Sequence, residues 1–341
     1  MIRYWRWLIV PAVLGLAIAL VWWRGPDWSA VGDAFNVVRW RWIVVAVGLN
    51  LLSIVARSLA WDTTIHQSLP SPYPRYRLVF SAFCVGLFAN AVLPARAGEL
   101  ARVAVLRRRL PARRGTTATL IGSVFAHRMF DLFPTLALVV WVLLAAQIPS
   151  SAYAVIAAVV GLGIILFLVA VVLARREQRE VVDGMGRLSQ VLSRVREGLA
   201  IMRNPAAAAQ ATVFQFAGWA CQLLAVWAAM RGFHIREPFA AAGLVLVTMN
   251  IVTIFPFWPG NVGLLQVAIA TALTPYGVAY AHGIAYGLGL QAIEASVGIG
   301  IGLVFLAREG LSYAMLKQFA PAEEAAAADE ERERPRAGVP G

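Results

Sequence analysis

Long apolar blocks alternate with short polar and basic segments along this chain. A helix needs about 20 mainly apolar residues to cross the hydrocarbon layer of a membrane. The runs that we interpret as spanning helices lie at residues 8–23, 42–61, 115–146, 152–173, 206–230 and 283–306. The pattern therefore predicts an all-α, polytopic membrane protein.

Two further apolar regions are interrupted by proline and glycine, so that neither part of each could span a bilayer alone. The first, 78–92 and 98–109, breaks at Pro94 and has basic flanks that predict both ends on one side. The second, 238–256 and 262–275, breaks within IFPFWPGNVG. We expect two re-entrant hairpins, whose non-helical tips must be buried in protein or line a wet cavity.

The two parts of the chain, 42–146 and 206–307, repeat one order of elements: a spanning helix, a hairpin and a second spanning helix. The first hairpin is expected to enter from inside and the second from outside, which makes an inverted repeat. Paired broken helices in such a repeat favour a substrate site near the membrane midplane. The alternative is a chance recurrence in a glycine-rich membrane protein. Helix 152–173 and a cytoplasmic helix at 177–203 would join the halves into one domain, 1–310.

The joining segment is basic, and its apolar residues from Val181 to Met202 step by four and three, as in an amphipathic helix. Such a helix could lie on the inner leaflet or pack on its own domain or a partner. Residues 24–41 have the spacing of a short interfacial helix. The tail at 321–341 is charged and poor in apolar residues, which predicts disorder.

The formal net charge is +12, although only 14% of residues are charged and 60% are apolar. In a soluble protein this excess would suggest nucleic acid as a partner. Here most arginines lie between apolar segments, which favours topology control and anionic lipid instead, with no nucleic acid. Their concentration in the proposed inner loops predicts an inner-membrane protein with both termini cytoplasmic. The first run could also be a signal peptide, but no convincing cleavage site follows it.

Charges inside the apolar regions are the candidate site, because a charge at membrane depth is expensive and marks function by default. Arg96 is our first candidate for binding a phosphate, since a guanidinium matches two phosphate oxygens and the helix start near Gly98 adds a positive dipole. It could instead pair structurally with Glu99 or Asp131, which could also carry a proton. The candidate substrate-binding residues are Asn90, Arg96, Glu99, Arg102, Arg128, Asp131, Asn261, Gln266 and Glu294.

Several single residues carry narrower expectations. Glu294 is a lone acid that faces either Gln266 or a neighbouring helix, and His127 is expected to be a hydrogen-bonded interior residue. Arg57, near the end of its helix, is expected to extend towards the interface. The glycines of 283–306 predict close helix packing. We find no nucleophile–base pair, metal-ligand spacing or phosphate-binding loop, and both cysteines lie in apolar runs, so neither an enzyme nor a cofactor is predicted.

The stretch LPARAGELAR at 93–102 resembles a sequence block of the lysylphosphatidylglycerol synthase transmembrane region family, also called the flippase-like domain. HRMFD at 127–131 and FPFWPGNVGLLQ at 255–266 resemble two further blocks. The resemblance implies movement of lipids or lipid-linked intermediates. One branch adds a soluble aminoacyl-transferase domain, which is not implied here. His127 and Gln266 stand where acids are usual, and Asn261 replaces a glycine, which puts proton coupling at the second hairpin in question.

These observations predict a transporter or flippase of an anionic phospholipid or lipid-linked precursor, whose head group lies in a charged groove between the hairpins. The alternative is a non-transporting membrane subunit that anchors a lipid- or envelope-polymer-modifying enzyme, with the basic segment 174–204 as the docking surface. A membrane-embedded enzyme acting on lipid phosphate is a third hypothesis, which lacks a plausible nucleophile. The expected partners are therefore an anionic lipid, the membrane and an envelope-biosynthesis enzyme.

Overall fold

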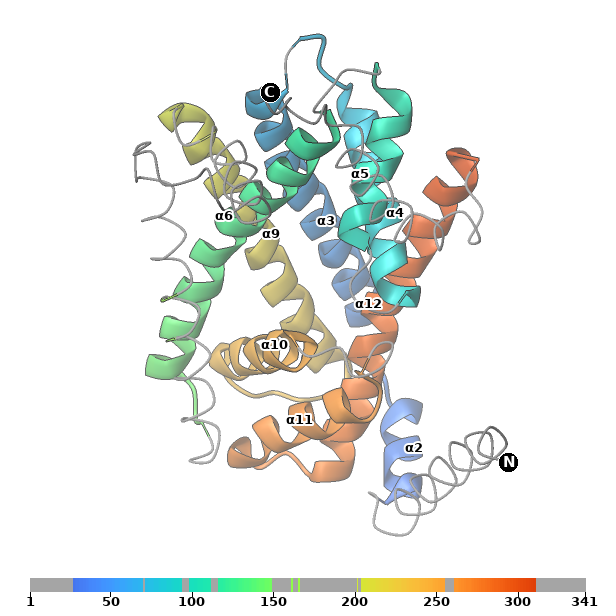
Figure 1. The fold of residues 1–341 in the computed structure, drawn as a ribbon. Helices are drawn as coiled ribbons and strands as arrows, with labels where there is room; N and C mark the ends of the chain where they lie inside the picture. Colours follow the sequence, from blue (N-terminus) through green and yellow to red (C-terminus); the bar gives the residue numbers. More distant parts are fainter. Residues whose placement is uncertain are drawn as a thin grey trace, which may run out of the picture.

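The computed structural model describes residues 27–69, 71–93, 98–111, 116–148, 204–254 and 261–310, together with the single residues 161, 165 and 201. All regular elements in these ranges are helices. In chain order they are α2 (Trp28–Asn36), α3 (Trp40–Ser68), α4 (Tyr76–Val92), α5 (Gly98–Arg109), α6 (Thr116–Ala145), α9 (Pro205–Gly232), α10 (Phe239–Ile254), α11 (Leu264–Leu273), the 3₁₀ turn η4 (Thr274–Tyr276) and α12 (Tyr280–Arg308) (Figure 1).

Four of these helices are long and apolar enough to cross a membrane, and they coincide with predicted spans. They are Trp40–Ser68, Thr119–Ala145, Pro205–Gly232 and Tyr280–Arg308. Their large apolar side chains include strongly exposed ones, such as Val44, Leu144 and Val304, as expected for helices that face lipid. The predicted helix at 8–23, the tail and almost all of 152–173 and 177–203 lie outside the described residues.

The spanning helices α3 and α9 pack antiparallel along their whole length (Figure 1). The hydroxyl of Ser53 donates to the carbonyl of Gly218 at 2.8 Å, halfway along both helices. At one end the amide of Arg39 donates to the carbonyl of Gly232 at 2.9 Å. Because neither glycine has a side chain, the two backbones approach closely, which is the usual way that membrane helices associate.

The short helices α4 and α5 form the first hairpin, with Leu93 and the undescribed residues 94–97 at its tip. Gly86 and Gly98 face each other, and a side chain on either would collide with the backbone of the other helix. The side-chain oxygen of Asn90 accepts from the amide of Gly98 at 2.9 Å and so caps α5. Glu99 in the first turn and three arginines in the last suit the dipole of this helix.

The second hairpin consists of α10 and α11, with residues 255–260 of its tip outside the described part. Asn261 adopts φ 46°, which asparagine tolerates better than most residues, and its amide donates to the carbonyl of Val252 at 2.9 Å. Both predicted pairs of half-helices are therefore present. Their insertion into a bilayer as re-entrant hairpins, and the inverted repeat, stay predictions.

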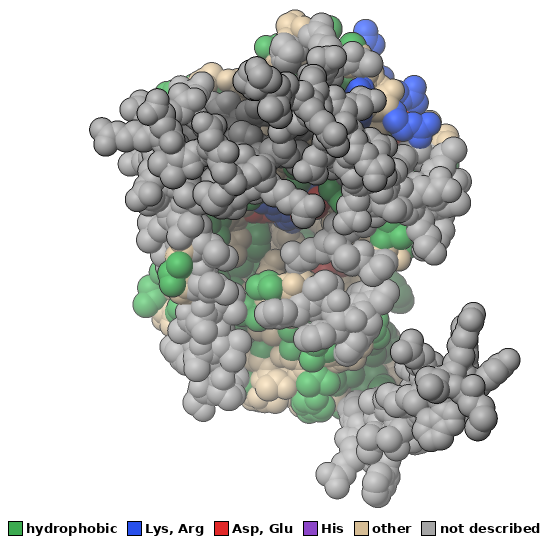
Figure 2. Space-filling model, viewed as in Figure 1, with side chains coloured by type: hydrophobic (Ala, Val, Ile, Leu, Met, Phe, Trp, Pro, Cys, Tyr) green, Lys and Arg blue, Asp and Glu red, His purple; other side chains and the backbone are tan. Residues whose placement is uncertain are grey.

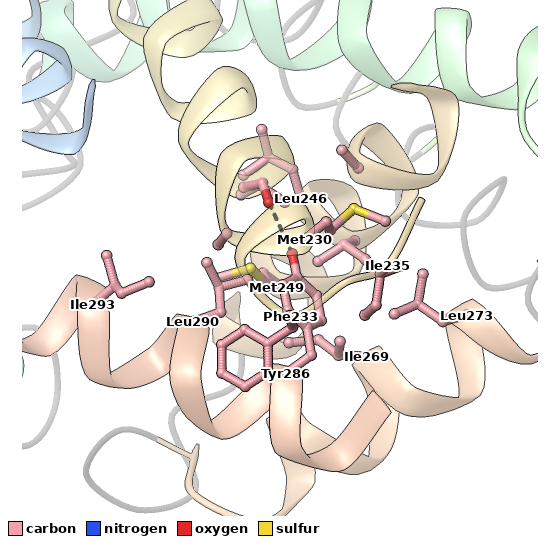
Figure 3. Close-up of a cluster of buried hydrophobic side chains, with 14 of the residues drawn as sticks. Met230, Phe233, Ile235, Leu246, Met249, Ile269, Leu273, Tyr286, Leu290 and Ile293 are labelled. Atoms are coloured by element: carbon pink, nitrogen blue, oxygen red, sulfur yellow. Dashed lines mark hydrogen bonds between the residues drawn. The ribbon is translucent and has the colours of Figure 1, made fainter. Parts of the chain in front are cut away.

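A buried apolar cluster holds α9, α10, α11 and α12 together (Figure 3). Phe233, from the end of α9, packs edge-on against Tyr286 of α12, with 5.9 Å between ring centroids. The Tyr286 hydroxyl is satisfied by the carbonyl of Val226 at 3.1 Å. This half of the molecule is thus a well-packed apolar core that contains a single satisfied phenol.

Helix α12 contacts both hairpins through glycines. Gly283 and Gly287 lie against Ala270 and Gln266 of α11, and Gly302 lies against α4. The prediction of close glycine packing is confirmed at these positions. It is wrong for Gly298 and Gly300, where an added Cβ would meet nothing within 4 Å, because these residues face away from the other described helices.

Candidate functional site

Asp131 of α6 is the centre of a charged cluster between the spanning helices. Its carboxylate accepts from Arg57 of α3 at 3.1 and 3.2 Å and from Arg128 at 3.1 Å. The indole N–H of Trp219 on α9 donates to it at 2.9 Å. Its side chain is only 10% exposed, so these three donors replace the water that the carboxylate would otherwise bind.

Arg128 extends the cluster to the first hairpin. Its Nε atom donates to Glu99 of α5 at 2.7 Å, and its Nη2 atom also contacts that carboxylate. The same guanidinium therefore connects Glu99 with Asp131. Our expectation that these acids are counter-charges is confirmed for Arg128.

The expectation that Arg57 extends to the interface is wrong. Its guanidinium binds Asp131 and the side-chain oxygen of Gln222, the latter at 3.3 Å, and its side chain is 22% exposed. An added Cβ on Gly218 of α9 would lie 2.6 Å from Cγ of Arg57, so the missing side chain leaves room for the arginine stem. With an acid at the same depth, pairing inside the protein replaces extension to the water.

Arg102 of α5 is buried without an ionic partner among the described residues. It is 4% exposed, and its guanidinium lies 4.6 Å from the ring centroid of Trp61 and 5.7 Å from that of Phe83. Its Nε and Nη2 atoms are buried and have no hydrogen-bond partner. Glu99, Asp131, Arg57 and Arg128 act on it only through longer-range electrostatic interactions.

His127 lies next to this arginine, on the other side of a shared aromatic ring. Its ring stands edge-on to Phe83, with 6.0 Å between centroids, and its Nδ1 atom is 3.4 Å from the amide nitrogen of Gln215. Gln215 also donates to the carbonyl of His127 at 3.2 Å. The predicted hydrogen-bonded interior histidine is confirmed.

Glu294 of α12 faces α9 rather than Gln266. The amide of Gln222 donates to its carboxylate at 3.5 Å, a weak contact. Gln222 thereby connects Glu294 with Arg57, so that a continuous polar chain runs from Glu99 on α5 to Glu294 on α12. Figure 2 shows basic and acidic side chains set back near the middle of one face, between the two ends of the molecule.

The remaining candidate residues lie at the hairpins. Asn90 and Asn261 make the tip hydrogen bonds described above. Gln266 is 2% exposed, accepts from the amide of Gly263 and donates to Gln291, one turn before Glu294 on α12. Arg96 lies outside the described residues, so its predicted role stays a prediction.

Three site residues were missed from the sequence. Arg57 and Gln222 carried a usable signal, because each is polar within a predicted span. Trp219 carried none, since it is one of 12 tryptophans, and its contact with Asp131 joins residues 88 positions apart. In the described part of the chain, no group of His, Cys, Asp and Glu could hold a metal ion.

Comparison with protein families gives one match. The family model described as Lysylphosphatidylglycerol synthase TM region covers residues 7–302, most of the chain. No curated protein and no solved structure matches it. The matched range contains every residue of the charged cluster, and with the four long apolar helices it identifies a multi-pass membrane protein.

Proposed function

The chain belongs to the lysylphosphatidylglycerol synthase transmembrane region family, and from this premise we propose that it moves an anionic lipid or lipid-linked precursor across the membrane. The phosphate of the head group would bind Arg102, beside the cluster formed by Glu99, Arg128 and Asp131. The acyl chains would stay in the bilayer. No described residue carries an ATP-binding motif, so movement would be downhill or coupled to a gradient.

The buried, unpaired guanidinium of Arg102 is the observation that carries this proposal. Burying a charge costs several kcal/mol unless a counter-charge and hydrogen bonds repay it. Stacking on Trp61 and Phe83 returns about 2 kcal/mol at most for each ring. Nε and Nη2 lie on one edge of the guanidinium, which matches two oxygens of a phosphate. An incoming anion would thus supply the missing partner.

The surrounding ion pairs explain why Arg102, rather than a neighbour, would bind the substrate. Arg57 and Arg128 are already neutralised by Asp131 and Glu99. A head group that bound either would have to displace a protein carboxylate. Arg102 requires no such exchange, and the nearby acids would keep the bound phosphate from being held too tightly to leave.

The alternative of a non-transporting anchoring subunit depends on the basic segment 174–204, of which only Ile201 and Asn204 are described. Among the described residues, nothing favours that alternative specifically. The buried Arg102 favours transport, because a docking function would not require a cation inside the helix bundle.

The test is lipid translocation in liposomes that contain the purified protein, with fluorescent phosphatidylglycerol and phosphatidylcholine as the neutral control. Arg102→Met keeps the size of the side chain and removes its charge, whereas Arg107→Gln removes a charge from the same helix away from the cluster. We expect phosphatidylglycerol movement above that of empty liposomes, an approximately tenfold or greater loss with Arg102→Met, and little change with Arg107→Gln.

Thermal unfolding of the same samples separates function from folding. Because Arg102 is a buried charge without a partner, Arg102→Met should be at least as stable as the natural chain while it loses transport. Equal transport by this variant would contradict the assignment to Arg102. No movement by the natural chain, with or without an imposed gradient, would contradict transport of this lipid.

A further inference from the structure

A second cavity, of about 560 Å³, lies at the foot of the first hairpin, where α4 and α5 meet the end of α12. We call it the foot cavity. Each of the three helices contributes one arginine to it, and three aromatic side chains form part of its wall. These residues are Arg77, Arg109, Arg308, Tyr76, Phe80 and Phe305.

The arginines of the foot cavity outnumber its acids. Glu309 is the acidic residue in the lining, and it is already bound by the hydroxyl of Ser81 at 2.7 Å and by Arg109 at 3.1 Å. Arg77 and Arg308 are exposed and form no ion pair with any described residue. The rim thus has two cations available to an anion.

The wall of the foot cavity is apolar and aromatic. The rings of Phe80 and Phe305 meet edge-on, with 5.4 Å between centroids, and Tyr76 lies against Phe80 at 6.0 Å. Arg308 lies over Phe305 at 6.0 Å, so a cation stands directly above the aromatic wall. A ligand that fits must therefore be anionic at one end and apolar at the other.

We infer that the foot cavity binds the head group and glycerol region of an anionic phospholipid, with its phosphate on Arg77 and Arg308. Basic pockets between membrane helices commonly hold such head groups. The volume falls in the range of ligand pockets, and is too small for the acyl chains, which would extend into the bilayer. The site is separate from Arg102, which lies seven residues, about 10 Å, before Arg109 along α5.

This inference does not require transport, so binding is measured directly. Native mass spectrometry of the full-length protein in detergent would be carried out in the Arg102→Met background, which removes the deeper site. Phosphatidylglycerol, phosphatidylcholine and inorganic phosphate are the three probes. We expect binding of one phosphatidylglycerol, much weaker binding of phosphatidylcholine and no comparable binding of inorganic phosphate.

The double substitution Arg77→Gln/Arg308→Gln should weaken phosphatidylglycerol binding about tenfold or more, because it removes two charge-assisted contacts. Both side chains are exposed, so the fold should persist. Arg107→Gln is the matched control, since it removes a nearby charge outside the foot cavity. Unchanged binding in the double variant, an equal loss in the control, or equally tight binding of inorganic phosphate would overturn the inference. Loss of transport without loss of this binding would concern Arg102 alone.

Discussion

The two hairpins of this protein share an arrangement but differ in chemistry. Each consists of two short packed helices, and in each an asparagine near the tip makes a side-chain hydrogen bond to the backbone of the hairpin. Helices α10 and α11 contain no charged residue, whereas α4 and α5 contain six, among them Glu99 and Arg102.

This difference shows that charge is not needed to build such a hairpin. In the second hairpin, Gln266 occupies a position where the resemblance implies an acid, and its amide is satisfied by Gly263 and Gln291 without a counter-ion. The charges of the first hairpin therefore require another explanation. The free guanidinium of Arg102 and the arginines of the foot cavity supply it, because both are suited to anions from outside the chain.

The largest effect should come from removing the charge that organises the first half. Asp131→Ala would leave Arg57 and Arg128 without their shared partner, so we expect about 3–5 kcal/mol less free energy of unfolding. Gln266→Ala, the comparison in the second half, should cost about 1–3 kcal/mol, because it leaves one buried amide unsatisfied. Denaturant unfolding in detergent measures both, and a smaller loss for Asp131→Ala would contradict the difference that we draw between the halves.

A middle-sized effect should distinguish the packed from the open glycines of α12. Gly289→Ala would drive a methyl group into the ring of Phe233 in the apolar core, at a cost of about 1–3 kcal/mol. Gly298→Ala meets nothing within 4 Å and should stabilise the helix by up to about 1 kcal/mol. Thermal unfolding of the two variants should therefore move in opposite directions. A lower melting temperature for Gly298→Ala would mean that its surroundings are more crowded than described here.

The smallest effect concerns the two tips. Asn90→Ala removes the cap of α5 and should cost about 1 kcal/mol. Asn261→Ala loses one hydrogen bond and a favourable residue for φ 46°, so it should cost slightly more. Hydrogen exchange of the first turns of α5 and α11 would locate the losses. Protection that falls equally throughout the chain would argue against a local role for these asparagines.

Much of the fold could be predicted, because long apolar blocks and the proline and glycine breaks are local signals. The second half-helix of the first hairpin was placed at 98–109, the bounds of α5 in the structure. The pairing of helices was less accessible. The contact of Ser53 with Gly218 joins residues 165 positions apart, and no local spacing specifies it.

The site could be predicted in its residue types but not in its connections. Charges in apolar segments correctly pointed to Glu99, Arg128 and Asp131 as one group. The sequence could not show that Arg57 completes this group, since its depth alone was compatible with extension to the interface. Nor could it show that Arg102 is the unpaired cation, because pairing depends on which helices are neighbours.

Helix α12 has a mechanical consequence for any movement of the two hairpins. Its first half is fixed to α11 through Gly283 and Gly287, and its second half is fixed to α4 through Gly302. Glu309 then binds side chains from both α4 and α5. A shift of one hairpin is therefore transmitted along this rod to the other, unless the rod bends where Gly298 and Gly300 contact nothing. Whatever moves in this protein, the moving bodies are not simply the two halves of its sequence.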